Sequence, residues 1–294
     1  MDERFVQVGI RPAAPPSKVR RRKWYAGKPV ASAAVLAVIL LGCLCCGLIA
    51  PRDPAYMDLF NTNAAPSSAF WFGTDAMGRD IFSMIWYGGS VSLFIGFFAT
   101  VISTAVAILF GAVSGLAPKW LDDVLMRLTE IFLSIPNLLL VIFIQAILGK
   151  ANALTIAFVI GITGWTGVAK VVRTEVRQMR ASEYVIAARC MGAGFWRILA
   201  KHLTPNFVSS IMFMVVMNIR GAIAAESTLS FMGIGLPVEV ISWGSMLSLA
   251  ERSMLSGAWW ILLIPGAFLV VTLLCITNIG NYLRKSVNRG QSNL

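Results

Sequence analysis

Six apolar stretches that carry almost no charge dominate this sequence, at about residues 31–50, 91–116, 131–149, 151–169, 207–233 and 258–281. A helix needs about 20 apolar residues to cross the hydrocarbon core of a bilayer, and it satisfies its own backbone polar groups there. The sequence therefore predicts an all-α membrane protein with six transmembrane helices. Only 13% of the residues are charged, which excludes a large soluble catalytic domain.

The prolines, cysteines and single histidine of the chain predict helix kinks and packing contacts rather than a metal or redox site. Pro136 and Pro265 lie inside two of them and predict helix kinks, because neighbouring helices can satisfy the backbone groups that proline frees. Cys43 and Cys46 have the CxxC spacing of metal and redox motifs, but they lie in the first apolar stretch and are interpreted as packing residues. Since His202 is the only histidine, we expect no metal site built by this chain.

The basic residues set the expected orientation, because Lys and Arg near the ends of spans favour the cytoplasmic side. Twenty of the 25 lie in residues 1–28, in the connections 117–130 and 170–201, and in the tail from 281. The opposite loops hold only four, Arg52, Arg79, Lys150 and Arg252. We therefore expect both termini in the cytoplasm. This orientation accounts for the net charge of +11, so we expect no nucleic-acid partner.

The loop after the first apolar stretch, residues 51–88, carries a polar run that is spaced by glycine and ends in an Arg-Asp pair. Its members are Gly73, Thr74, Asp75, Ala76, Met77, Gly78, Arg79 and Asp80. Such a run predicts a tight turn that leads into an amphipathic helix before the second span. The simpler interpretation is the capped start of a helix.

The connection after the fourth apolar stretch begins with four basic residues spaced three or four positions apart: Lys170, Arg173, Arg177 and Arg180. This spacing places them along one face of a helix, so the fourth span is expected to continue into the cytosol. A basic stripe of this kind usually faces anionic lipid headgroups or water. The alternative is contact with an acidic partner.

A short helix with small side chains is expected next. Ser182 offers a side-chain oxygen to cap it, and Glu183 places a negative charge in its first turn. Ala187 and Ala188 lie in its middle. Gly192 ends it, because glycine adopts a left-handed conformation easily.

A second short amphipathic segment with Phe195 and Trp196 follows, before Pro205 opens the fifth span. Small side chains let a helix enter a groove of another protein, and apolar residues on a loop favour a covering partner. We therefore interpret the loop at about 181–205 as a docking element.

This loop resembles the cytoplasmic signature of the permease subunits of ABC importers, specifically the second permease of the dipeptide, oligopeptide and nickel type. The signature is Glu-Ala-Ala, three residues, Gly and an end with proline, and its matches here are Ala187, Ala188, Gly192 and Pro205. Ile186 replaces the signature glutamate, with Glu183 three residues earlier, and Thr204 stands where leucine is usual. The helix, the glycine turn and the proline stay in register.

Three further segments carry the resemblance. The runs 73–75 and 78–80 are similar to the exterior signature of these permeases, although Met84 and Ser90 replace two arginines that are often found there. Residues 226–235 and 243–247 resemble their late segments. The matches occur in the same order as in the family and together cover about residues 70–280.

The resemblance implies the type I ABC importer permease fold, in which two homologous permease subunits form the pathway and two ATP-binding subunits dock beneath them. A solute-binding protein outside the inner membrane of a prokaryote would deliver the cargo. The short helix would be the coupling helix, and the residues expected to contact the ATP-binding subunit are Ser182, Glu183, Ala187, Ala188, Gly192, Ala193, Phe195 and Trp196.

The expected organisation has five parts. They are a basic cytoplasmic segment at 1–30, a first transmembrane helix at 31–50, an extracytoplasmic loop at 51–88, a permease core at 89–283 and a cytoplasmic tail at 284–294.

The resemblance implies that the energy for transport comes from ATP hydrolysis in other subunits. A phosphate-binding P-loop needs the pattern G-x-x-x-x-G-K-[ST]. The nearest run, residues 164–171, has Ala169 and Val171 at the required glycine and hydroxyl positions. We therefore expect no catalytic residue and no cofactor in this chain, with ATP and Mg²⁺ bound by the partner subunits.

Two charged residues of the fifth apolar stretch are candidates for the pathway. A charge inside the bilayer costs about 2.5 to 3.5 kcal/mol on insertion scales, so Arg220 needs a partner or a watery cavity. Glu226 lies six residues on, about 240° around the helix, so the two do not pair with each other. We expect Arg220 to face the translocation cavity, or alternatively to pair with another span or the second permease.

Small hydroxyl residues in the spans, such as Ser103, Thr104, Ser114 and Thr166, either line the pathway or pack helices together. The sequence does not distinguish these two roles.

The expected function is half of the translocation pathway of an ATP-driven importer of di- or oligopeptides, with nickel or a metal chelate as the alternative cargo. A stand-alone channel or secondary transporter would leave the docking loop without a purpose. An intramembrane enzyme is disfavoured, because the sequence has no G-x-S-x-G run and a single histidine.

Overall fold

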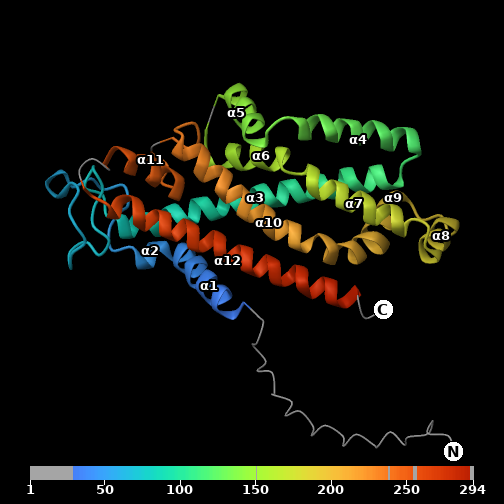
Figure 1. Ribbon diagram of the computed structural model, residues 1–294, viewed down its shortest axis with the longest axis horizontal. Helices are drawn as coiled ribbons and strands as arrows, with labels where there is room; N and C mark the ends of the chain where they lie inside the picture. The colour runs from blue at the N-terminus through green and yellow to red at the C-terminus, as the bar shows by residue number, and fades with distance from the viewer. Residues whose placement is uncertain (1–28, 150, 238, 254–256, 292–294) are drawn as a thin grey trace, which may run out of the picture.

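The computed structural model describes residues 29–149, 151–237, 239–253 and 257–291, which form helices and the loops that join them (Figure 1). Their one β feature is an isolated bridge between Thr74 and Asp80, which agrees with the expected all-α class. In chain order the helices are α1 (Val30–Leu44), α2 (Cys46–Ile49), the 3₁₀ helix η1 (Leu59–Asn61), α3 (Ile81–Leu116), α4 (Lys119–Ser134), α5 (Asn137–Leu148), α6 (Ala153–Thr163), α7 (Thr166–Met179), α8 (Glu183–Cys190), α9 (Phe195–Arg197), the π-helix η2 (Ile198–Leu203), α10 (Thr204–Phe231), α11 (Trp243–Ser253) and α12 (Trp260–Gln291).

Three continuous helical stretches among the described residues are long and apolar enough to cross a membrane. They are Ile81–Leu116, Phe195–Phe231 and Trp260–Ser286. The count rises to five if each of two bent pairs, α4 with α5 and α6 with α7, forms one span. The apolar helix α1 has 15 residues and is shorter than a full crossing. The expected number of six spans is therefore not confirmed.

Helices α3, α10 and α12 run side by side along the long axis of the molecule (Figure 1). α8 lies at one end of this bundle, and the loop before α3 lies with α11 at the opposite end. The loop expected in the cytosol and the loop expected outside are thus separated by the length of α3.

Small residues let α3 approach its neighbours closely. A Cβ at Gly111 would lie 2.6 Å from the carbonyl oxygen of Ala169 on α7. A Cβ at Gly161 of α6 would lie 2.9 Å from the carbonyl oxygen of Ala99 on α3. In a bilayer helices associate through such packing, because lipid tails are as apolar as leucine. These contacts hold α3 at the centre of α6, α7 and α10.

The two prolines inside apolar stretches behave differently. Pro265 lies inside the continuous helix α12. Pro136 stands instead at a break, where α4 and α5 meet at 90°. The expectation of a kink at Pro136 is therefore wrong: proline removes a backbone donor, and the chain here starts a new helix with Pro136 as its N-cap. A second break of 45° separates α6 from α7 at Gly164 and Trp165.

Replacing Gly111 by alanine should destabilise the protein by about 1–3 kcal/mol, because the added methyl group forces α3 away from α7. The matched control is Gly221→Ala on α10, where a Cβ meets nothing within 4 Å. We expect thermal unfolding in detergent several degrees lower for the first variant and unchanged or higher for the second. Equal unfolding temperatures would contradict the close packing.

Candidate coupling loop and translocation cavities

The basic stripe on α7 contacts an acidic residue of its own chain. Arg173 donates to both carboxylate oxygens of Asp122 at 2.5 Å, and Arg177 donates to one of them at 2.8 Å. Ser114 of α3 donates to the same carboxylate at 2.6 Å. Asp122 lies near the start of α4, ahead of its apolar part. The hydrogen bond from Arg173, with help from Ser114 and the two positive charges, lowers the pKa of Asp122 to about 2.

The interpretation that this stripe faces lipid headgroups or water is therefore wrong for Arg173, whose side chain is 22% exposed. Arg177 pairs with Asp122 while 41% of its side chain stays exposed. Arg180 also contacts its own chain, since it donates to the carbonyl oxygens of Gly115 at 3.1 Å and Ala117 at 3.4 Å at the end of α3. The stripe thus fastens α7 to α3 and α4. Sequence reasoning missed Asp122, because it lies 51 positions from Arg173 and no local pattern joins them.

The short helix α8 follows this fastened region and buries only part of its surface. Val185 and Ala188 are buried, and Val185 joins the apolar core formed with α3, α7, η2 and α10. Ile186 of α8 is 49% accessible. Two apolar residues that follow the helix are exposed as well, Met191 at 80% and Trp196 of α9 at 68%. Of the predicted contact residues, Glu183, Ala187 and Gly192 are exposed, and Ser182, Ala193 and Phe195 are half-buried.

A glycine turn ends α8 as predicted. Gly192 has φ of 80°, its N–H donates to the Arg189 carbonyl, and the N–H of Ala193 donates to the Ala188 carbonyl. This pair of bonds is the Schellman arrangement, which needs a left-handed residue. The start of the helix differs from the prediction: Ser182 occupies the N-cap position, but its hydroxyl donates to the Met179 carbonyl at 2.6 Å and caps nothing.

At the other end of the bundle, the run 73–80 forms a buried turn. The Asp75 carboxylate accepts from the backbone N–H of Met77 and of Arg79, and it pairs with the Arg79 guanidinium at 2.6 Å. The Asp80 carboxylate accepts from the Ser83 N–H and caps α3. The turn therefore leads directly into α3. The simpler interpretation, a capped helix start, is confirmed, and the helix expected after the turn is continuous with the second span in α3.

This turn also forms hydrogen bonds and close contacts with neighbouring segments. Thr74 accepts from the Ala64 N–H, and its carbonyl accepts from the Trp260 indole at 3.2 Å at the start of α12. Gly78 has φ of 74°, and a Cβ there would lie 1.8 Å from the carbonyl oxygen of Asp58. Gly73 and Gly78 thus allow the close approaches that keep the loop compact.

Glu226 is fully buried and is held by hydroxyl groups. Its carboxylate accepts from Ser242 at 2.8 Å, from Ser92 and Ser230 at 3.0 Å each, and from Ser227 at 3.3 Å. No cation pairs with it in the described part of the chain. These bonds join α10 to α3 and to the segment that starts α11.

Arg220 lies on α10 with an exposed side chain, and it forms no ion pair with a described residue. The expected pair with another span is therefore not present among the described residues, and Arg220 lines neither of the two cavities described below. Its neighbour Gly221 lines a cavity.

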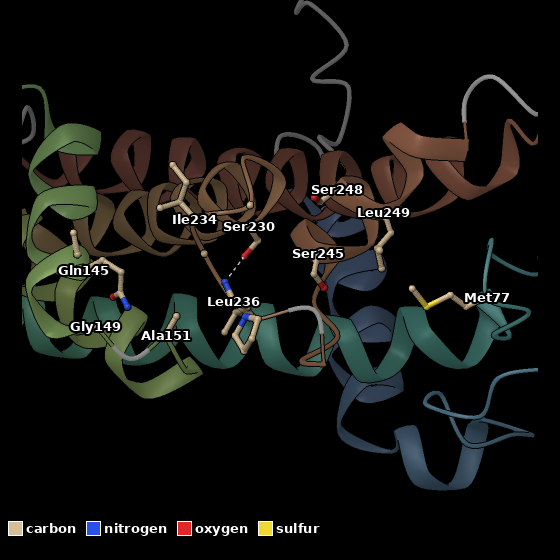
Figure 2. A pocket seen from close by; sticks show the side chains of 14 residues that line it. Met77, Gln145, Gly149, Ala151, Ser230, Ile234, Leu236, Ser245, Ser248 and Leu249 are labelled. Atoms are coloured by element: carbon tan, nitrogen blue, oxygen red, sulfur yellow. Dashed lines mark hydrogen bonds between the residues drawn. The ribbon is translucent and has the colours of Figure 1, made fainter.

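One of the larger cavities, the α10–α11 cavity, has a volume of about 530 Å³. Figure 2 shows Met77 and Leu249 at one side of it, Gln145 and Gly149 at the other, and Ser230 between them. The Ser230 hydroxyl accepts from the Leu236 N–H at 3.2 Å, which fixes the loop after α10 along the cavity.

The second cavity, about 450 Å³, lies where both helix breaks meet, and we call it the helix-break cavity. It is lined by residues of α3, of both breaks and of α10, among them Thr100, Ser103, Pro136, Asn137, Thr163, Gly164, Thr166, Asn218 and Gly221. No charged residue lines either cavity. The residues that the structure describes hold no group of three or more His, Cys, Asp or Glu that could bind a metal ion.

This arrangement matches a known family of transport proteins. Residues 107–289 match the family described as the binding-protein-dependent transport system inner membrane component. The chain belongs to this family. It is therefore a membrane permease of a transport system, which agrees with the resemblance seen in the sequence.

Curated relatives support the assignment over most of the chain. The chain is 35% identical to the dipeptide transport system permease protein DppC of Bacillus subtilis, over 82% of this chain and 75% of the relative. It is 34% identical to the oligopeptide transport system permease protein OppC of the same organism, over 86% and 83%. It is 33% identical to the glutathione transport system permease protein GsiD of Pectobacterium atrosepticum, over 88% and 86%.

A solved structure shows the same fold. A chain of the MetNI methionine ABC transporter, in an inward-facing conformation, superposes with a TM-score of 0.55 at 16% sequence identity. The match covers 69% of this chain and 96% of the other. The expected ABC importer permease fold is thus confirmed.

Replacing Asp122 by asparagine should destabilise the protein by about 2 kcal/mol, because Arg173 and Arg177 lose their shared anion. The matched control is Glu130→Gln, which breaks an exposed pair with Arg127. Such a surface pair contributes less than about 1 kcal/mol. Thermal unfolding of the two purified variants distinguishes them, and an equal effect would contradict the fastening of α7 to α4.

Proposed function

We propose that this chain is one of two permease subunits that form the pathway of an ATP-driven importer of di- or oligopeptides. The observation that carries the proposal is α8, a short helix at one end of the bundle with exposed apolar side chains at Ile186 and nearby Trp196. A free apolar surface of this kind favours a protein partner. The relatives named dipeptide and oligopeptide permeases support peptides as the cargo.

In this proposal, separate subunits hydrolyse the ATP that drives transport. Two ATP-binding subunits hold ATP and Mg²⁺ and dock at α8, since this chain has no P-loop. A homologous second permease completes the pathway, and an extracytoplasmic solute-binding protein delivers the cargo. Closure of the ATP-binding subunits pulls the coupling loops together and opens the cavity outward.

The orientation rests on the distribution of basic residues. α8 lies at the end of the bundle that the Lys and Arg count assigns to the cytoplasm. The turn at 73–80 lies at the opposite, extracytoplasmic end. The protein is then a multi-pass protein of a prokaryotic inner membrane with both termini in the cytoplasm.

The lining of the cavities favours peptides over nickel. Both cavities offer hydroxyl and amide groups and no charged side chain, which suits a zwitterionic solute that needs hydrogen bonds along its backbone. A nickel ion needs imidazole, thiolate or carboxylate ligands, and the described residues gather none into a site.

Transport by the complete assembly tests the cargo. Proteoliposomes with both permeases, both ATP-binding subunits and the binding protein should accumulate labelled Ala-Ala when ATP and Mg²⁺ are added. They should not accumulate radioactive nickel. Nickel uptake without peptide uptake would overturn the peptide assignment.

A valine at Gly192 should uncouple the loop, because an L residue at its φ of 80° costs about 1–2 kcal/mol and distorts the turn. The matched control is Gly194→Val, where φ of −73° and ψ of 168° suit valine and the site is equally open. We expect normal membrane insertion for both, and a several-fold loss of peptide uptake and peptide-stimulated ATPase for Gly192→Val.

If both variants take up peptide at the wild-type rate, this loop does not couple ATP hydrolysis to transport. Loss in both variants would instead place the effect at the docking surface rather than in the turn, which still supports contact with the ATP-binding subunit.

A further inference from the structure

The two bent helix pairs break at the same place. α4 ends and α5 begins at Ile135 and Pro136, and α6 ends and α7 begins at Gly164 and Trp165. Residues from both breaks line the helix-break cavity. Each break begins a helix, so the amino ends of α5 and α7 meet at one cavity inside the bundle.

These two helix starts are incomplete in hydrogen bonding. The first backbone N–H groups of any helix have no acceptor within it and carry about half a positive charge at its end. The N-cap residues Pro136 and Trp165 give no side-chain cap. The carboxyl ends of α4 and α6 lie at the same breaks and carry the opposite partial charge. The two helix starts therefore add free N–H donors to the cavity rather than a net charge, and no acidic residue lines the cavity to accept from them.

A hydroxyl group without a protein partner also lies at the same place. Thr166, the first residue of α7, is 6% exposed, lines the cavity and has no hydrogen-bond partner among the described residues. The other buried threonines of the lining differ, because Thr100 donates to the Gly96 carbonyl and Thr163 to the Val159 carbonyl. The Thr166 hydroxyl is therefore available to a ligand in the cavity.

Uncharged polar groups of α10 and α3 also line the helix-break cavity. Asn218 of α10 donates to the Ser103 hydroxyl at 3.4 Å, and both residues line the cavity. A Cβ at Gly221 would meet nothing within 4 Å, so this part of α10 leaves room for a ligand. No lysine or arginine lines the cavity, which disfavours a doubly charged phosphate.

We propose that the helix-break cavity binds the terminal carboxylate of the transported peptide through the Thr166 hydroxyl and the amino ends of α7 and α5. The free N–H groups of the two helix starts suit the oxygens of a carboxylate, and anions in other proteins bind at helix amino ends. This inference rests on the proposed function, since the carboxylate belongs to the peptide cargo. It adds a selective step inside the permease to any selection by the binding protein.

The first test replaces Thr166 by valine, which has the same shape but no hydroxyl, and by serine, which keeps the hydroxyl. The assembly in proteoliposomes is given Ala-Ala or its terminal amide, with the same binding protein throughout. Thr166→Val should lower Ala-Ala uptake about tenfold and lower the ratio of acid to amide uptake, because a hydrogen bond to a charged group is lost. Thr166→Ser should keep both near the wild-type values.

Since the binding protein is unchanged, a shift in the acid-to-amide ratio belongs to the permease. Thr166→Val with the wild-type rate and ratio would overturn the inference. A lower rate for acid and amide alike would also overturn it, because that result indicates a structural role for Thr166.

A second measurement does not depend on transport. A cysteine is placed at Gly221 in a chain whose five native cysteines are alanine. A negatively charged methanethiosulfonate reagent should label it faster than a positively charged one, with each rate divided by the rate of the same reagent with free cysteine in solution. Ala-Ala should protect it better than Ala-Ala amide. Equal labelling by the two reagents, or equal protection by the two peptides, would contradict an anion site.

The two experiments separate this inference from the proposed function. If the wild-type assembly imports Ala-Ala but neither the Thr166 variants nor the Gly221→Cys labelling shows carboxylate preference, only the inference fails. If the wild-type assembly imports no peptide, the proposed function fails, and the charge preference at position 221 still decides whether the cavity binds anions.

Discussion

The close approach of α3 to α6, α7 and α10 is the constraint on which the rest of the structure depends. It needs residues without side chains, because a Cβ at Gly96 would lie 2.5 Å from the Ile223 side chain and one at Gly115 would lie 2.7 Å from the Val176 side chain. A bilayer gives no hydrophobic drive for two apolar helices to associate, so the contact surface itself has to provide the attraction. α3 is thus the central helix on which α6, α7 and α10 pack, with the coupling loop near one end of the bundle and the 73–80 turn near the other.

Both ends of this central helix are tied by a buried carboxylate that accepts from a serine of α3. Ser114 donates to Asp122, which also holds Arg173 and Arg177 of α7. Ser92 donates to Glu226, which also accepts from Ser242 before α11. Buried charged groups are stable only when hydrogen bonds replace their water. Helix α7, which leads to the coupling loop, and the segment before α11 are therefore each connected to α3 through a polar cluster, while no charged residue lines the two described cavities.

The sequence predicted the features that local chemistry decides. The left-handed turn at Gly192 and the capped helix start at Asp80 follow from a few adjacent residues, and both are present. Features that depend on distant partners could not be predicted. Asp122 meets Arg173 only because α4 folds back on α7, and Glu226 meets Ser92 across 134 positions. Whether Pro136 bends or breaks a helix depends on how neighbouring helices pack around it, as the unbroken α12 at Pro265 shows.

The native cysteines offer the most direct test of docking at α8. Cys190 on α8 and Cys45 between α1 and α2 are both exposed and free. Maleimide labelling of the two is measured in detergent, with and without the ATP-binding subunits. The account predicts that these subunits slow labelling of Cys190 and leave Cys45 unchanged. Equal labelling of Cys190 in the assembled complex and in the permease alone would contradict it.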